Sequence, residues 1–207
     1  MPKRIYLIRH GETDYNKEER MQGWLDIILN QNGHDQAEKL ALRLEKEEID
    51  VIYSSDLKRT VQTARALAKR KKIPHYQSRL IREHNMGVFE GWQYKKEKDY
   101  RNALWEEMMV AQQNHDLHWD GSQGETLHHF LGRVKRFINK IEQKHPKETV
   151  IIFTHGGTKN RILEVLGLKK VEDKFIPFDS TSVTILEQKD GEYVMTVKND
   201  TSHLNAI

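Results

Sequence analysis

The sequence predicts an α/β protein with a mainly parallel sheet that helices cover on both faces. Short apolar runs of strand length alternate with segments in which apolar residues recur at helical spacing. This alternation favours parallel strands that are joined by right-handed crossovers. Near the C-terminus, residues 181–187 and 193–197 alternate between apolar and polar around Lys189-Asp190-Gly191, a pattern typical of a β-hairpin. We therefore expect an antiparallel hairpin at one edge of the sheet.

The first half of the chain holds two expected strands and two expected helices. Residues 5–11 are an apolar run that ends in Arg-His-Gly, and residues 49–53 form a second apolar run. Between these strands, a helix is expected after the Asn32-Gly33 pair, and it ends near residue 47. Its apolar face is formed by Ala37, Leu40, Ala41 and Leu44. The second helix is expected from about residue 57 to 69, with Ser54-Ser55-Asp56 as its N-cap.

The second half begins with an irregular segment that Pro74 opens, followed by a charged and aromatic helix at about residues 95–113. The most clearly amphipathic helix follows Gly124-Glu125-Thr126 and ends at Pro146. An apolar run at residues 150–153 then leads into Thr-His-Gly-Gly and a further helix. This run repeats the pattern of residues 5–11, because an apolar strand again ends at a histidine and a glycine.

Residues 1–207 are predicted to form a single domain, since no linker, repeat or low-complexity tract divides the chain. Residues 88–120 are expected to form a cap over the active site. Four aromatic residues are expected to pack this cap onto the core, with a place in the wall of a substrate pocket as the alternative. These residues are Trp92, Tyr94, Tyr100 and Trp105.

Charge and composition narrow the classes of partner. The chain has 34 Lys and Arg and 31 Asp and Glu, which are interspersed and give a net charge of +3. This pattern argues against nucleic-acid and membrane-surface binding and suits a small anionic substrate. Cysteine is absent, which excludes disulfides, thiolate catalysis and cysteine-ligated metals. No apolar stretch reaches membrane-spanning length, so a cytoplasmic location is expected. The oligomeric state stays open, with a homodimer through the hairpin edge as one option.

Three expected strand ends carry the polar groups of a candidate site. They are Arg9-His10-Gly11, the turn from Ser54 to Arg59, and His155-Gly156-Gly157. In open α/β sheets, ligands bind beyond the carboxyl ends of the strands. An arginine fork matches the oxygens of a phosphate, and a helix N-terminus adds backbone N–H donors. The sequence therefore predicts an anion site, most naturally for a phosphoryl group.

Two kinds of chemistry fit a histidine among arginines. His10 could bind phosphate passively, or its ring nitrogen could attack phosphorus and carry the group as phosphohistidine. The second reaction needs a proton donor for the leaving alcohol, and Glu83 is the candidate. Arg9, Arg59 and, if protonated, His155 would then stabilise the transferring phosphoryl group. Neither a metal nor a cofactor is required.

Four other histidines lack the spacing and the acidic partners of a metal site, and we expect them to be surface or packing residues. They are His115, His118, His128 and His129.

The motifs together resemble those of the histidine phosphatase superfamily, in its phosphoglycerate-mutase-like branch. The chain looks like a short, phosphatase-type member of that branch. They occur in the family's order across nearly the whole chain. The matching stretches are residues 7–13 (Leu-Ile-Arg-His-Gly-Glu-Thr) with Asn16, residues 54–64, Glu83 with Gly87 and Glu90-Gly91, Gly124-Glu125-Thr126, Thr154-His155-Gly156-Gly157, and residues 199–204. Such an ordered set is far more specific than a single Arg-His-Gly.

The resemblance implies a three-layer α/β/α sandwich around a mainly parallel sheet. It implies His10 as the phosphorylated nucleophile and Glu83 as general acid and then general base toward water. By the same resemblance, Arg9, Arg59 and His155 hold the phosphoryl group. The positions expected to contact phosphate or substrate also include Asn16, Gln22, Gly23 and Gly156.

Three functions follow from these motifs. The first is a metal-independent phosphomonoesterase that acts on a small phosphorylated metabolite. The second is a phosphoglycerate mutase, which returns the phosphoryl group to a second hydroxyl. The third is a non-catalytic phosphate-binding protein. Mutases of the family typically carry a longer middle insertion, so a chain of 207 residues favours the phosphatase. The presence of every expected catalytic residue type argues against the third function.

Overall fold

A six-stranded sheet forms the centre of the computed structural model, which describes residues 1–114 and 116–205. The strands lie in the order β3-β2-β4-β1-β5-β6. Four of them are parallel: β1 (Arg4–Arg9), β2 (Val51–Ser54), β3 (His75–Gln77) and β4 (Thr149–Thr154). β5 (Val183–Lys189) runs antiparallel to β1, and β6 (Glu192–Asp200) pairs antiparallel with β5. The predicted parallel sheet with an antiparallel edge hairpin is confirmed.

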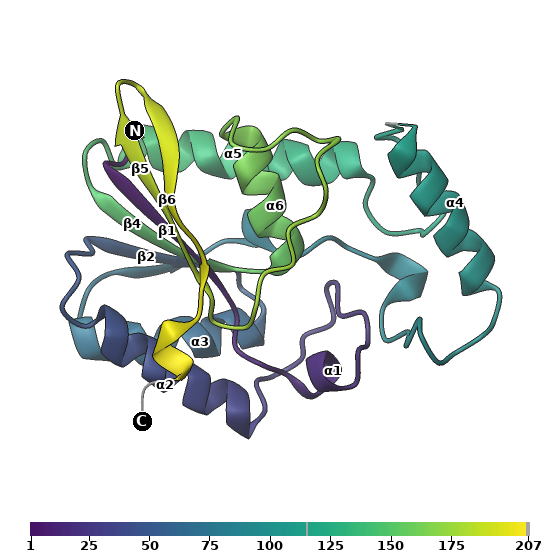
Figure 1. Ribbon diagram of the computed structural model, residues 1–207, viewed down its shortest axis with the longest axis horizontal. Helices are drawn as coiled ribbons and strands as arrows, with labels where there is room; N and C mark the ends of the chain where they lie inside the picture. Colours follow the sequence, from purple (N-terminus) through teal and green to yellow (C-terminus); the bar gives the residue numbers. More distant parts are fainter. Residues whose placement is uncertain (115, 206–207) are drawn as a thin grey trace.

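Helices cover both faces of the sheet (Figure 1). On one face lie α2 (Gln31–Leu44) and α3 (Lys58–Lys71), and on the other lie α5 (Leu127–Lys144) and α6 (Gly156–Val165). Side chains alternate between the two faces along β1. Ile5 and Leu7 join the apolar cluster under α5 and α6, whereas Tyr6 and Ile8 join the cluster under α2 and α3. Because both faces are covered, the strand is an unbroken apolar run.

The segment at residues 88–120 lies apart from the sheet. Its helix α4 (Arg101–Gln113) stands beyond the carboxyl ends of the parallel strands (Figure 1). This segment has a small apolar cluster of its own, with Phe89, Trp92 and Met108 buried at its centre. The short elements are α1 (Asp14–Lys17) and the 3₁₀ turns η1 (Arg79–Ile81), η2 (Gly87–Phe89) and η3 (Ser202–Leu204).

Several predicted element boundaries are wrong, for local reasons. α2 begins at Gln31, because the side chain of Asn30 caps it by accepting from the Gly33 amide, so Gly33 lies inside the helix. The N-cap of α3 is Leu57, without a side-chain cap from residues 54–56. A short strand, β3, lies where an irregular segment is predicted.

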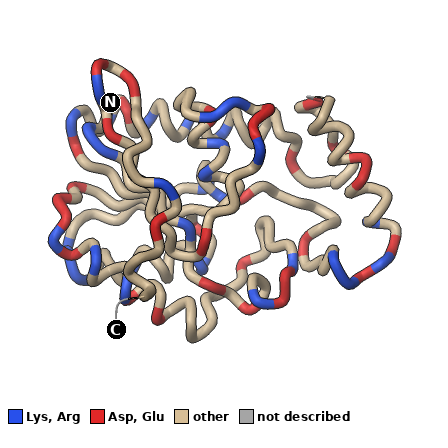
Figure 2. Tube along the Cα trace, viewed as in Figure 1, with Lys and Arg blue, Asp and Glu red and all other residues tan. Residues whose placement is uncertain are grey.

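The charged residues are interspersed along the chain and over the molecule (Figure 2). This distribution agrees with the near balance of 34 basic and 31 acidic residues. Within residues 1–114 and 116–205, no helix combines the length and the apolar character needed to cross a membrane.

Candidate active site

The two predicted histidines lie side by side at the carboxyl ends of neighbouring strands. His10 follows β1 and His155 follows β4, and these strands pair in parallel with Arg9 opposite Thr154. The centroids of the two imidazole rings are 5.3 Å apart, and the ring planes are inclined by 61°. Both side chains are almost completely buried. The strand-end pattern thus brings together residues that are 145 positions apart.

The His10 ring is held in one tautomer by the backbone. Its Nδ1 lies 2.7 Å from the Gly11 carbonyl oxygen. Because a carbonyl oxygen only accepts, Nδ1 must carry the proton, and Nε2 keeps a free lone pair. Burial first, and then the charges of Arg59 and Arg9, lower the pKa of His10 well below its ordinary value. The imidazole is therefore neutral at pH 7, which is the form a nucleophile needs.

Two arginines stand beside His10, Arg59 fully buried and Arg9 partly buried, and each is oriented by backbone carbonyls. Arg9 donates from Nη1 to the Phe178 oxygen at 2.6 Å. Arg59, in the first turn of α3, donates to the oxygens of Leu25 and Gly23, both at 2.8 Å. Within the described part of the chain, the Nε of each arginine is buried without a hydrogen-bond partner. Burial lowers the pKa of Arg59 to about 10, so it stays cationic at neutral pH. Two desolvated cations with unused donors form a site for an anion.

His155 shares this shortage of partners. Among the residues described, both its ring nitrogens are buried without a hydrogen bond. Burial is the main cause that lowers its pKa well below the ordinary value, and Arg59 adds to it. An unpaired buried polar group is costly in free energy, and a bound oxyanion would supply the missing partner.

Glu83 reaches the same place from the loop after η1. Its carboxylate accepts from the amides of Gly157 (2.9 Å) and Thr158 (3.1 Å) at the N-terminus of α6. Its main-chain oxygen accepts from Trp24 Nε1 and from Arg133 Nη2, both at 2.7 Å. The Glu83 carboxylate therefore lies at the N-terminus of α6, against the first helical turn after His155.

Arg133 is a supporting residue that sequence reasoning missed. It is buried in α5, donates to the carbonyl oxygens of Leu80 and Arg82, and pairs with the Glu125 carboxylate. These bonds fix the segment that carries Glu83. The signal in the sequence is an acidic residue, Glu125, just before the N-cap of α5 and an arginine in the second turn of that helix.

The other predicted contact residues line the same cavity as His10. Asn16 accepts from the amide of Thr13, the N-cap residue of α1, and so completes its capping box, while Gln22 accepts from the Thr13 hydroxyl. Gly23 has φ of +49°, and a Cβ there would meet the Glu90 carboxylate at 2.2 Å. Its carbonyl orients Arg59, so this backbone position matters through that arginine. Gly156 is the first residue of α6.

The cavity has a volume of about 680 Å³ and extends from His10 to α4. Of the four aromatic residues discussed above, Tyr94 and Trp105 line it, Trp92 is buried in the cluster of the 88–120 segment, and Tyr100 is 66% exposed. Sequence reasoning missed the apolar residues of the wall, which come from loops without periodicity. They include Met21, Met86, Val171, Phe175, Pro177 and Phe178.

The other histidines that the structure describes form no recognisable metal site. No group of three or more His, Cys, Asp or Glu side chains within residues 1–114 and 116–205 is placed to hold a metal ion. The rings of His118 and His128 stack with centroids 4.6 Å apart, and His129 lies next to them. His115 lies outside the described residues.

Comparison with known proteins identifies the family of this chain. Residues 5–201 match the family model of the histidine phosphatase superfamily, branch 1. The chain is 34% identical over 205 residues to phosphoglycerate mutase-like protein 4 of Arabidopsis thaliana, covering 97% of this chain and 86% of that protein. It is 32% identical over 205 residues to the metal-independent phosphoserine phosphatase of the same plant, covering 98% and 84%.

A solved structure extends the likeness to three dimensions. A mutant phosphoserine phosphatase from Entamoeba histolytica, in complex with phosphoserine, matches with a TM-score of 0.83 and 25% identity, covering 99% of this chain and all of that one. The predictions of a histidine-phosphatase fold and of a phosphatase are confirmed. The chain belongs to the histidine phosphatase superfamily, branch 1.

Proposed function

We propose that this protein hydrolyses phosphomonoesters in two steps through a phosphohistidine at His10. The main support for the proposal is the neutral His10 ring, held with its proton on Nδ1 beside the buried Arg59 and the partly buried Arg9. A ring in this state has a lone pair for attack, and the arginines favour an anionic phosphate next to it.

In the first step, His10 Nε2 forms a bond to phosphorus as the bond from phosphorus to the alcohol oxygen breaks. The protonated Glu83 carboxyl gives its proton to the leaving oxygen. The phosphorylated ring carries a positive charge, and the Gly11 carbonyl, which accepts from Nδ1, stabilises that charge.

In the second step, Glu83, now a carboxylate, takes a proton from water as the water oxygen attacks phosphorus. The bond from phosphorus to Nε2 breaks, and inorganic phosphate and neutral His10 are formed. Both steps are balanced without a metal ion, because Glu83 cycles between its two protonation states.

Charge on the phosphoryl oxygens is stabilised by groups from three strand ends. Arg9 follows from β1, Arg59 from the first turn of α3 after β2, and His155 from the end of β4. The amide of Gly156 at the start of α6 adds a donor with a favourable dipole. Asn16 and Gln22 lie at the rim of the same cavity as polar partners.

The substrate is a small phosphorylated molecule, and residues 88–120 act as the cap above it. Support comes from the relatives, one named for phosphoserine and one solved with phosphoserine bound. The cavity wall supplies further support, because residues of α4 line the side opposite the strand ends. One domain, residues 1–207, then carries both parts of the site.

The decisive experiment combines turnover with isolation of the intermediate. We expect the protein to hydrolyse p-nitrophenyl phosphate in excess chelator. Rapid quenching with labelled substrate should give an acid-labile, base-stable phosphoprotein. His10→Ala should abolish both signals, while His34→Ala, at an exposed histidine of α2, should retain them. A His10→Ala variant as active as the parent would contradict the mechanism.

The mutase alternative is tested with 3-phosphoglycerate and a bisphosphoglycerate primer. A phosphatase releases inorganic phosphate from the ester, whereas a mutase converts it to the 2-isomer without net release. Primer-dependent isomerisation that exceeds phosphate release would replace hydrolysis as the main reaction.

A further inference from the structure

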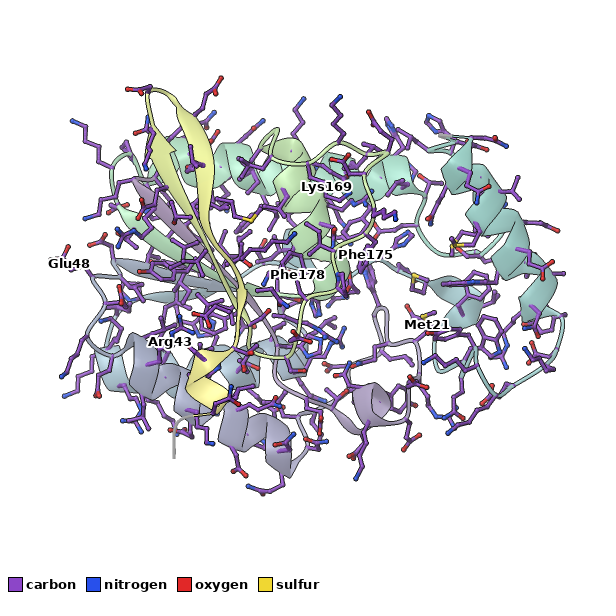
Figure 3. The ribbon with its side chains drawn as sticks, in the orientation of Figure 1. Met21, Arg43, Glu48, Lys169, Phe175 and Phe178 are labelled. Carbon is purple, nitrogen blue, oxygen red and sulfur yellow. The ribbon has the colours of Figure 1, made fainter. Side chains whose placement is uncertain are left out.

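The cavity changes character beyond the phosphate end. Around His10 its wall is charged, but farther out it is built mainly from apolar side chains of four segments. They are the loop after α1 with Met21, the 88–120 segment with Trp105 and Met109, α5 with Phe130, and the loop between α6 and β5 with Phe175 and Phe178. Figure 3 shows Met21 on the side toward α4, and Phe175 and Phe178 on the side toward the sheet. A substrate bound at His10 would project its alcohol part between these walls.

The cations in this outer wall already have partners. Arg20 pairs with Glu18 at 2.7 Å and with Glu97 at 2.9 Å. Arg161 pairs with Glu164 at 2.8 Å, and its side chain is only 11% exposed. A second anionic group on a substrate would have to compete with these carboxylates.

The remaining polar groups of the outer wall carry no net charge. His84 has its Nε2 at 2.7 Å from the Glu125 carbonyl oxygen, and its ring stacks on Phe130. Burial lowers its pKa, so this ring is neutral at pH 7. Gln22 and Gln112 are neutral amides. Among the described residues that line the cavity, the cations not engaged by carboxylate side chains are those of the phosphate end.

Several of the apolar wall residues are exposed to solvent. Phe175 is 58% exposed, Met109 is 40% exposed and Val171 is 37% exposed, although all three line the cavity. Exposed apolar surface around a concave site marks a place where apolar ligand surface is buried on binding. The two lips of the cavity, one on α4 and one on the loop before β5, are therefore built to cover an apolar group.

We propose that the alcohol part of the preferred substrate is uncharged and largely apolar, as in an aryl or medium-chain alkyl phosphate. This inference rests on the proposed function, because it assigns the group that leaves from phosphorus. It distinguishes the protein from its relatives named for phosphoserine, whose substrate carries an ammonium and a carboxylate. The main support is that the outer wall is mostly apolar and that its arginines already pair with carboxylate side chains.

The first test is a chain-length series of n-alkyl phosphates from methyl to hexyl, compared with O-phosphoserine and 3-phosphoglycerate. We expect kcat/KM to rise by about fourfold per methylene, the scale set by burial of one methylene group. The charged esters should be turned over more slowly than the hexyl ester. A flat series, or a preference for either charged ester, overturns the proposal.

Binding separates this proposal from the proposed function. The n-alkyl phosphonates cannot be hydrolysed, and their dissociation constants by calorimetry should fall with chain length in the same way. If p-nitrophenyl phosphate is not hydrolysed but the phosphonates show this trend, the hydrolase is refuted and the apolar subsite stands. If hydrolysis occurs and neither series shows a trend, the subsite is refuted and the hydrolase stands.

Variants on α4 locate the subsite. Met109→Ala should reduce the dependence on chain length, whereas Val110→Ala should not, because Val110 is exposed on the same helix but does not line the cavity. Met109→Arg places an unpaired cation on the lip and should raise the relative kcat/KM for O-phosphoserine. Equal effects of Met109→Ala and Val110→Ala would contradict the assignment of this lip.

Discussion

The two ends of the cavity are built in different ways. At the phosphate end, His10, Arg59 and His155 come from strand ends and the first turn of a helix, and all three are buried. At the outer end, they come from α4 and from loops, and several are exposed. A rigid sheet places the first group, while the second group depends on segments packed above it. This contrast separates the chemistry of the site from the choice of substrate.

The two ends of the cavity also differ in their effect on the stability of the folded protein. Arg9, Arg59 and His155 bury polar atoms that lack partners within the described residues. Such groups reduce stability until a ligand satisfies them, a common trade between activity and stability. The outer wall needs no such compensation, because none of its described side chains buries a polar atom without a partner. We expect substitutions there to be tolerated more easily.

The largest expected contrast is between His10→Ala and Trp105→Ala. The first removes the nucleophile and should lower kcat by at least about 10⁴-fold. The second removes one apolar wall residue and should lower kcat/KM by about tenfold, mainly through KM. Steady-state kinetics on one alkyl phosphate measures both. Losses of similar size would show that the division between chemistry and substrate choice is wrong.

Glu83→Gln should separate the two ends through the leaving group. An alkoxide needs a proton to leave, so we expect a loss of roughly 10² to 10⁴ in kcat/KM with an alkyl phosphate. p-Nitrophenolate leaves without a proton, so the loss should be much smaller when formation of the phosphoenzyme is measured in a single turnover. The variant keeps the size of the side chain at the α6 terminus. Equal losses with both substrates would argue that Glu83 only orients groups and donates no proton.

The C-terminal turn supports the phosphate end and gives a pH-dependent prediction. His203 Nε2 lies 3.0 Å from the Thr181 hydroxyl, and the Thr181 amide donates to the carbonyl oxygen of Arg9 at 3.1 Å. Burial first, and then Arg43, lower the pKa of His203 from 6.5 to about 4, although Asp200 opposes this shift. The unfolded chain therefore binds more protons between these two pH values.

The sign follows from proton linkage. The contribution of His203 to stability is complete above pH 6.5 and is lost as the pH falls toward 4. We expect this group to change the free energy of unfolding by on the order of 2 kcal/mol across that window. Urea titrations of the parent and of His203→Gln at several pH values measure the difference. An unchanged slope in His203→Gln would show that this histidine is not the group that titrates.

The same contrast explains how much the sequence could predict. The sheet and the meeting of His10, Arg59 and His155 follow from local patterns, because apolar strands end at polar residues and parallel strands align their ends. The outer wall had no such signal. Phe175 and Met21 lie in loops without periodicity, and their place in the wall depends on how these loops pack.

Errors in the element boundaries have a similar origin. Gly33 would ordinarily mark the end of an element, yet it lies inside α2. A glycine is needed at this position because a Cβ would meet the Glu12 carbonyl oxygen at 2.1 Å. That close approach is a tertiary contact between the helix and the segment after His10. Short-range patterns contain no information about such contacts, so the predicted start of the helix was wrong.

The smallest expected effect is the change in the free energy of unfolding when the unpaired His155 ring is removed. Since both its nitrogens are buried without partners in the described chain, His155→Leu should raise the free energy of unfolding by about 1 kcal/mol in the absence of ligand. Inorganic phosphate should stabilise the parent and should stabilise this variant less, because one partner of the anion is gone. Urea unfolding with and without phosphate measures both changes. The matched variant Val194→Leu, at an exposed position of β6, should respond to phosphate as the parent does. If His155→Leu is destabilised without ligand, the His155 ring has hydrogen-bond partners in the free protein. The phosphate end then lowers the free energy of unfolding less than its unpaired atoms indicate.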